Sequence, residues 1–388
     1  MLFTLEALDA KHGDALLLHY GTLDDPQLIV VDGGPSGVWT RRLRPRLAAL
    51  RASRAGEAAL SIVAVVVSHI DDDHVNGILQ MFTAIERGTD GGDDAGLDVA
   101  SLWHNSFDDL APKVQPQALD AAVARVKPVA LGGEVPKALG ISRAGALVLA
   151  SVSQGRDLRN AAKRLGIPVN FDGKGGLIKA PSTGGHVETI GNGLRMTVLG
   201  PLAPQLAALQ VDWDKEIARL KKQGKLTPAG LLGILADFVD RSVNNLSSIV
   251  LLAEAGGRRM LLTGDARGDF ILDGAKKAGL LKHGAMRVDV LKLPHHGSIR
   301  NVKKELFEQI VADHYVISAD GRFDNPDVDT LKALFAARPK GPYTLYFTNR
   351  ITRVVTFLKG KLPKDVKVVT RGAQNASVAV HLGDRLKD

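Results

Sequence analysis

Residues Ser68-His69-Ile70-Asp71-Asp72-Asp73-His74 place two histidines and three aspartates within seven positions. The apolar, β-branched stretch 62–67 before them is typical of a strand buried on both faces, and residues 74–86 after them show helical apolar spacing. Side chains two apart in an extended segment leave on one side, and α/β sheets place their sites at strand carboxyl ends. The segment therefore predicts a metal site, with ligands suited to zinc, manganese or iron. The alternative is a solvated loop in which one aspartate caps the helix.

Composition narrows the classes of protein that can carry such a segment. The chain has 388 residues, of which 45% are hydrophobic and 24% charged, so it can bury a sizeable core. It contains no cysteine, which excludes disulfides, thiolate nucleophiles, iron–sulfur clusters and cysteine-ligated zinc. The net charge of +8 is compatible with a polyanionic partner without establishing one.

Two later clusters also follow apolar strands. Thr263-Gly264-Asp265 comes after residues 260–262, and Leu293-Pro294-His295-His296-Gly297-Ser298 ends the stretch 288–293. An aspartate at a strand end is also ordinary turn chemistry, and adjacent histidines can be surface residues of a turn. At the same sheet edge as the first segment, however, both clusters would add carboxylate and imidazole ligands.

In this order the motifs resemble those of the metallo-β-lactamase-fold hydrolases. The resemblance is strongest to the branch that includes the metallo-hydrolase domain of bacterial competence DNA-uptake channels and its stand-alone soluble relatives. Further matching pieces are His12-Gly13-Asp14, Val31-Asp32-Gly33-Gly34, Leu102-Trp103-His104-Asn105 and Ser242-Val243-Asn244-Asn245-Leu246-Ser247-Ser248-Ile249. The resemblance implies an αββα sandwich, in which two mixed sheets lie between helix layers and enclose a site for two divalent ions, zinc or manganese.

The resemblance also implies roles for individual residues. His69 and Asp71 would hold one ion, Asp73 and His74 the other, and Asp265 would bridge them. His296 or its neighbour His295 would be a ligand or the proton donor, so Asp73 and His295 are the candidate catalytic residues. Asp32 would orient a ligand histidine from outside the site, while Asp14 and Asn245 belong to matching segments without a defined role.

The chain departs from the family pattern at three places. Asp71 stands where the broader superfamily has histidine, which favours manganese. No clear counterpart exists for the histidine expected between the first two motifs, for which His104 and His186 are candidates. Relatives carry Gly-His-Pro after the last core strand, whereas this chain reads Asp324-Asn325-Pro326, so Asp324 or Asn325 would have to substitute and the second ion would be weakly held.

The organisation along the chain suggests a single domain over residues 1–388. We expect a mostly helical and loop insertion at about 87–190, and basic C-terminal hairpins at about 340–388, over residues 343–358 and 366–382. No signal peptide or membrane span is evident, so a cytoplasmic location is expected. The sequence does not indicate an oligomeric state.

Basic residues indicate the substrate class. Arginines at 41, 42, 44, 46, 51 and 54 occur without an intervening acid, and residues 340–371 carry eight positive charges and one negative, or +7. Such surfaces favour a phosphate-bearing substrate, possibly DNA or RNA, although they are also common as solvated faces. The sequence thus predicts a metal-dependent phosphodiester hydrolase. The alternatives are a hydrolase of small esters, lactones or lactams, and a metal-poor module that binds nucleic acid or protein without turnover.

Overall fold

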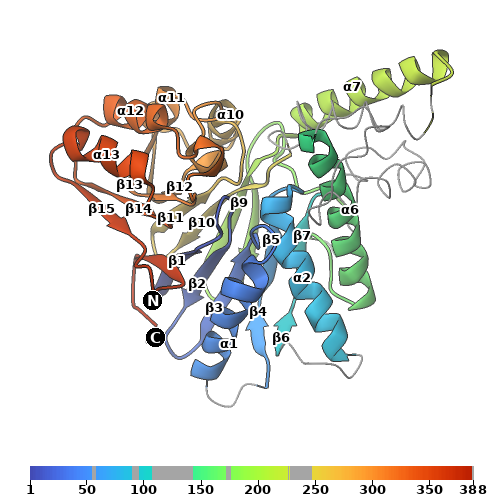
Figure 1. The fold of residues 1–388 in the computed structure, drawn as a ribbon, viewed down its shortest axis with the longest axis horizontal. Helices are drawn as coiled ribbons and strands as arrows, with labels where there is room; N and C mark the ends of the chain where they lie inside the picture. Colours follow the sequence, from blue (N-terminus) through green and yellow to red (C-terminus); the bar gives the residue numbers. More distant parts are fainter. Residues whose placement is uncertain are drawn as a thin grey trace.

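The computed structural model of the chain describes residues 1–54, 58–89, 96–106, 143–171, 176–225, 227 and 247–386. Within these ranges two mixed sheets pack face to face (Figure 1). In spatial order, the six-stranded sheet contains β16 (Ser377–His381), β1 (Leu2–Leu8), β2 (Leu16–Gly21), β3 (Pro26–Val31), β5 (Ala64–Val67) and β7 (Leu102–His104). The eight-stranded sheet contains β15 (Val366–Thr370), β14 (Tyr343–Phe347), β13 (Ile310–Ile317), β12 (Met286–Lys292), β11 (Arg258–Leu262), β10 (Val250–Ala255), β9 (Leu194–Gly200) and β8 (His186–Ile190). A small pair, β4 (Leu60–Ile62) and β6 (Leu97–Val99), lies beside them.

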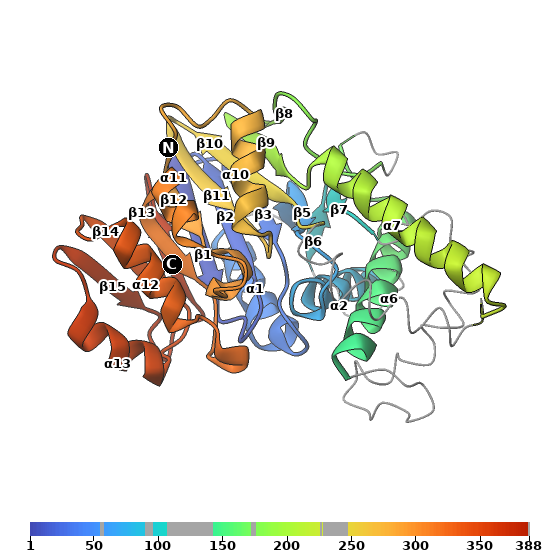
Figure 2. The same cartoon turned by 90° about the horizontal axis from the view of Figure 1, so that it is seen from above.

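Helices cover the outer faces of both sheets. The six-stranded sheet is covered by α1 (Arg44–Ser53), α2 (Asp72–Thr89) and α6 (Arg143–Arg164). The eight-stranded sheet is covered by α10 (Gly268–Lys277), α11 (Lys304–Gln309), α12 (Val328–Ala337) and α13 (Thr352–Lys361). Seen from above, α7 (Ala203–Lys222) extends along the end of the sandwich beyond β7 (Figure 2). The helix–sheet–sheet–helix layering is the predicted αββα sandwich.

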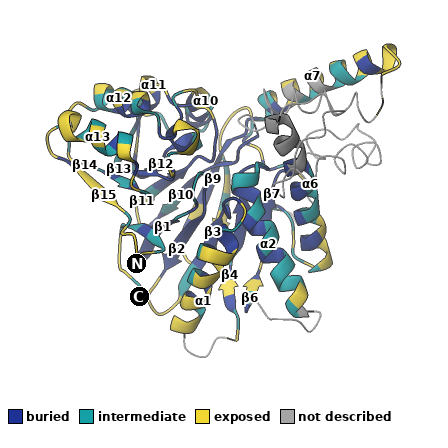
Figure 3. Ribbon diagram, viewed as in Figure 1, coloured by how far each residue is buried: buried dark blue, intermediate teal, exposed yellow. Residues whose placement is uncertain are grey.

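Apolar residues on both faces of the central strands explain why the sheets are enclosed. In β2, Leu18 faces the core between the sheets, while its neighbour Leu17 packs under the outer helices. The central strands are correspondingly buried, and the exposed residues lie on the outer helices, the loops and peripheral strands such as β15 (Figure 3). Alternating side chains that are apolar on both sides leave no face suited to water, so the layers must stack. Among the described residues, no helix combines the length and apolar character needed to cross a bilayer.

Two expectations about organisation were wrong. Residues 340–386, the described part of the C-terminal region, contain no hairpin: residues 352–361 form α13, and β15 joins β14 in parallel while β16 pairs with β1 in the other sheet. The β-branched residues around Val354 favoured a strand, but Val354, Phe357 and Leu358 recur at helical spacing and pack on the core. Strands β7 and β8, expected inside the insertion, are instead members of the two sheets.

The start of α2 is held against the loop after β3 by two glycines. A methyl group on Gly77 would lie 1.9 Å from the carbonyl oxygen of Gly33, and one on Gly33 would lie 2.4 Å from the backbone nitrogen of Ile78. Only glycine at both positions permits this approach. It brings the first turn of α2, with Asp73 and His74, against the carboxyl end of β3.

Candidate metal centre

Strand ends from both sheets meet between the layers. The first sheet contributes residues 68–74, which follow β5, and Asp32, which follows β3. The second contributes Asp265, after β11, and the turn Pro294–Gly297, after β12. Because β11 and β12 are parallel neighbours, their carboxyl ends lie side by side.

The carboxylate of Asp265 lies among the imidazoles. Its Oδ1 is 3.3 Å from Nε2 of His74, while its Oδ2 is 3.9 Å from Nε2 of His69 and 3.6 Å from Nε2 of His296. Asp73 joins from the far side, with Oδ2 3.4 Å from Nε2 of His296. Among the residues that the structure describes, four overlapping sets each bring three donor atoms within 4.8 Å of one another: His69–His74–Asp265, Asp73–His74–His296, Asp14–Asp32–His74 and Asp14–Asp265–His296.

His74 is held in place from behind. Its Nδ1–H donates to Oδ2 of Asp32 at 2.9 Å, and Asp32 accepts further bonds from the Ser68 backbone N–H and hydroxyl, each at 2.7 Å. With Nδ1 occupied, Nε2 of His74 points toward Asp265. A carboxylate that fixes a ligand histidine in this way is common around metal sites, which is the position expected for Asp32.

His296 is oriented by the second sheet. It adopts a left-handed backbone (φ 55°), and its Nδ1 lies 3.0 Å from the carbonyl oxygen of Ser318 and 3.4 Å from Oδ1 of Asp14. Its Nε2 therefore faces the donor cluster. His295, also left-handed (φ 48°), is 32% exposed at its side chain and places Nε2 3.6 Å from Oδ2 of Asp265. The geometry thus turns Nε2 of His296 into the donor cluster and leaves His295 at its solvent side.

Lys292 was assigned no role from its sequence context, yet the structure places it at this site. Its side chain is 0% exposed, and Nζ lies 2.6 Å from Oδ2 of Asp14, itself 1% exposed. The signal was present, since a single charged residue in an apolar, buried strand end requires a partner. Lys292 holds Asp14, and Asp14 in turn contacts Nδ1 of His296.

The donor cluster fits a metal ion because its inward atoms have no protein partner. Nε2 of His69, His74 and His296 and Oδ1 of Asp265 are buried and make no hydrogen bond. Buried polar groups are normally satisfied, so four such atoms converging on one point are the arrangement expected of an ion-binding site. Imidazole nitrogen and carboxylate oxygen are the donor set of zinc and manganese sites.

Electrostatics favour a cation at the same place. Burial alone would lower the pKa of His296, but Asp265 and Asp14 outweigh it and raise the pKa to about 10. For His74 burial is likewise outweighed by Asp265, Asp32 and Asp73, so its pKa is also raised. Burial opposes ionisation of Asp265, yet the surrounding histidines lower its pKa well below the usual range. The cluster therefore stabilises positive charge in its interior.

Three further residues predicted from the sequence, Asp71, His104 and His186, lie outside the three-donor sets of the described residues. Asp71 lies at the rim, with Oδ2 3.3 Å from Nε2 of His69, although it completes none of the three-donor sets. His104 is buried on β7, and its Nε2 lies 3.3 Å from the Gly155 carbonyl oxygen. Nε2 of His186 lies 2.5 Å from Oε1 of Glu188. Neither histidine belongs to a donor set among the described residues. Asn245 lies outside the residues that the structure describes.

The segment that replaces the family's Gly-His-Pro leaves Asp324 outside the donor sets of the described residues. Asp324 is 89% exposed at its side chain, and Oδ1 faces Arg353 at 3.4 Å. Asp324 completes none of the donor sets among the described residues. Asn325 is buried, and its place as a substitute for the missing histidine stays a prediction.

Some residues of the two basic runs form ion pairs with acids of the protein, while most of the others are exposed. Arg42 and Arg371 both bind Asp9, and Arg46 binds Glu6.

A group of cations lies near His12. Burial lowers the pKa of Lys11, and the charges of Arg41, which is exposed, and Arg322 lower it further. Lys11, Arg41 and Arg322 form what we call the cationic rim, next to His12, whose own pKa is lowered by burial and influenced by Asp73 and His296.

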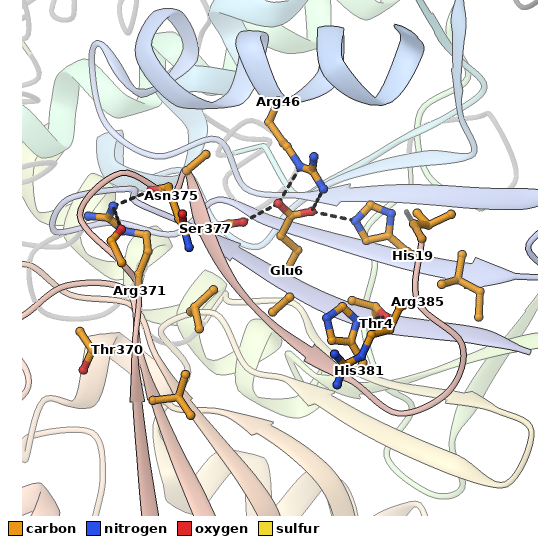
Figure 4. A pocket seen from close by; sticks show the side chains of 17 residues that line it. Thr4, Glu6, His19, Arg46, Thr370, Arg371, Asn375, Ser377, His381 and Arg385 are labelled. Carbon is orange, nitrogen blue, oxygen red and sulfur yellow. Dashed lines mark hydrogen bonds and ion pairs between the residues drawn. The ribbon is translucent and has the colours of Figure 1, made fainter. Parts of the chain in front are cut away.

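A separate cavity of about 560 Å³ lies on the outer face of β1, β2 and β16. There Glu6 binds Arg46 through two bonds, of 2.7 and 3.2 Å, and also contacts His19 at 3.0 Å and Ser377 (Figure 4). This cavity contains none of the donor sets described above.

Comparison with known proteins adds little to this geometry. No protein-family model matches the chain, and no curated protein matches its sequence. One solved structure, from Parabacteroides distasonis and provisionally described as a metal-dependent hydrolase, aligns over 95% of this chain and 92% of its own, with 10% identity and a TM-score of 0.34. A similarity this weak carries no argument about function.

Proposed function

We propose that the protein is a metal-dependent hydrolase of phosphodiester bonds in nucleotides or nucleic acid. The observation that carries the proposal is the convergence of three unpartnered imidazole nitrogens on the carboxylate of Asp265. His69, His74 and Asp265 would hold one ion, and Asp73 with His296 would hold a second. Divalent ions there would supply Lewis-acid activation of water and of a phosphoryl oxygen.

The protein's own residues would position and protonate the substrate. His295 lies at the solvent side of the cluster, where it could give a proton to the leaving oxygen. Asp32 and Asp14 would keep His74 and His296 in the required orientation. The cationic rim would attract the anionic substrate toward the site, which favours a phosphodiester over a neutral ester or lactam.

The test combines metal content with a substrate panel. Protein purified without chelator is expected to hold about one or two equivalents of zinc or manganese by elemental analysis, and to hydrolyse bis-p-nitrophenyl phosphate rather than p-nitrophenyl butyrate or nitrocefin. Asp265→Asn should remove metal and activity together. His186→Gln, a histidine outside the donor sets, is the matched control and should change neither.

Two outcomes would contradict the proposal. Hydrolysis of only the ester or the lactam would assign the site to the second class of substrate. A protein that holds less than half an equivalent of any divalent metal, and cleaves none of the substrates after metal addition, would be a binding module.

A further inference from the structure

The loop after β13 presents an aromatic side chain to solvent. Phe323 is 75% exposed, which makes it the most exposed large hydrophobic residue in the part of the chain that the structure describes. Its backbone is left-handed (φ 54°), as is that of the next residue, Asp324 (φ 61°). A bulky residue rarely adopts this conformation, and such strain persists only where surrounding contacts impose it.

Those contacts come mainly from Arg353 on α13. Its Nη1 donates to the carbonyl oxygen of Gly321 at 3.2 Å and to Oδ1 of Asp324 at 3.4 Å, and its Nη2 donates to the carbonyl oxygen of Pro326 at 3.5 Å. The loop is therefore braced from behind on both sides of Phe323. Hydrogen bonding maintains an arrangement in which an apolar ring faces water, contrary to what burial of apolar surface would favour.

The same loop borders the metal centre. The backbone N–H of Asp327 donates to the carbonyl oxygen of Gly297 at 3.1 Å, which fixes the loop to the turn carrying His296. On its other side the Phe323 ring meets His12 edge-on, with centroids 5.5 Å apart. His12 precedes Gly13, on which a methyl group would lie 2.0 Å from the carbonyl oxygen of Asp73.

A cation lies beside this aromatic pair. Nη1 of Arg322 is 3.4 Å from Nδ1 of His12, and Arg322 is a member of the cationic rim with Lys11 and Arg41. An exposed ring offers a stacking surface for any nucleobase, while adjacent guanidinium and ammonium groups bind phosphate. An aromatic face next to cations therefore matches a nucleotide better than an apolar or a purely anionic ligand.

We propose that Phe323 and His12 form a stacking site for a nucleobase at the mouth of the metal centre, with Arg322 facing the phosphate of the same nucleotide. The inference rests on the proposed function, which supplies the phosphodiester. It deepens that function by assigning nucleotides, rather than simple alkyl phosphodiesters, as the substrate class.

The test compares adenosine 5′-monophosphate with ribose 5-phosphate, which has the same phosphate but no base. Their affinities for the purified protein are measured by titration calorimetry. Stacking is expected to make the nucleotide bind about ten-fold more tightly. Phe323→Ala should abolish this preference, and Phe323→Trp should retain it. Leu23→Ala removes an exposed apolar side chain before β3, at the end of that strand opposite Asp32, and should leave the preference unchanged.

The thermal stability of Phe323→Gly distinguishes a binding role of the ring from a structural one, because loss of a structural side chain would lower Tm. Glycine tolerates positive φ, so this variant should raise Tm while losing the preference for the nucleotide. Equal affinities of the wild type for the two ligands, or an unchanged preference in Phe323→Ala, would overturn the inference. If only the proposed function is wrong, the preference for the nucleotide would persist and depend on Phe323, but no phosphodiester would be cleaved.

Discussion

The ammonium group of Lys292 lies 2.6 Å from the carboxylate of Asp14, and the two side chains are 0% and 1% exposed. Removing one partner from such a pair leaves an uncompensated charge in the interior. Lys292→Met and Asp14→Asn should therefore each lower the free energy of unfolding by about 3–5 kcal/mol.

Urea denaturation of both single variants and the double variant checks this. The double variant should lose clearly less than the sum of the single losses, because neither charge is left unpaired. Arg287→Met and Asp313→Asn are the controls, since the basic partner of this ion pair also lies on β12, but both side chains are exposed, 71% and 45%. Each should cost less than about 1 kcal/mol, and strict additivity at the buried pair would contradict the assignment.

Metal affinity should depend on the residue behind His74. Asp32→Asn keeps the shape of the side chain and tolerates the left-handed backbone there (φ 59°), but it weakens the bond to Nδ1 of His74. We expect metal affinity to fall about 10- to 100-fold, as for other partners that orient ligand histidines. Competition with a chromogenic chelator measures the change, with the exposed Asp273→Asn on α10 as control. Wild-type affinity in a folded Asp32→Asn protein would exclude this role.

Because α2 lies so close to the loop after β3, replacing a glycine at this contact by alanine should have the opposite effect on stability from the same change elsewhere in a helix. Gly77→Ala should destabilise the protein, because the added methyl group would meet the Gly33 carbonyl oxygen at 1.9 Å. Gly360→Ala on α13 meets nothing within 4 Å and should stabilise by about 0.5–1 kcal/mol, the usual gain for this change within a helix. Thermal unfolding of the two variants gives the signs, and a gain for Gly77→Ala would show that the approach is looser than described.

Acid stability should reflect Glu6 beneath the outer cavity. Burial would raise the pKa of Glu6, but the hydrogen bond from His19 and the charge of Arg46 outweigh it and lower the pKa from 4.5 to about 2. The ionised form is thus stabilised in the folded protein. Its contribution, about 3 kcal/mol by linkage, is complete above pH 4.5 and is lost as the pH falls toward 2.

Glu6→Gln should therefore be less stable than the wild type at pH 6, with the difference shrinking as the pH falls toward 3. Denaturant unfolding at a series of pH values measures it. An identical pH dependence in both proteins would show that Glu6 ionises as freely in the folded state as in the unfolded chain.

The sequence was sufficient to predict the layers and the residues that gather between the sheets, because both depend on local patterns, while their role as metal donors stays a prediction. Apolar runs such as 62–67 identify buried strands, and polar clusters directly after them identify a sheet edge. The partnership of Lys292 with Asp14 joins residues 278 positions apart in the printed sequence, so no local pattern could reveal it. Thr352–Lys361 was misassigned because β-branched residues favour strands while tertiary packing makes the segment a helix.

Substrate features were harder to predict for a different reason. The arginine run at 41–54 appeared as a basic surface, yet Arg42 and Arg46 are bound to acids from β1 and the loop that follows it. Conversely, Phe323 carries no motif, and its exposure arises from a backbone conformation held by Arg353. Charge pairing and loop conformation depend on the assembled fold.

The donor residues come from both sheets, and this division bears on the order of events during synthesis. Residues 68–74 leave the ribosome nearly 200 positions before Asp265 does, and His296 follows later still. A nascent chain that ends before His296 has only part of the cluster and can offer an ion few of its final contacts. If the proposed centre binds metal, loading would thereby be deferred until the second sheet has docked on the first, so the ion would report on completed assembly as well as on chemistry.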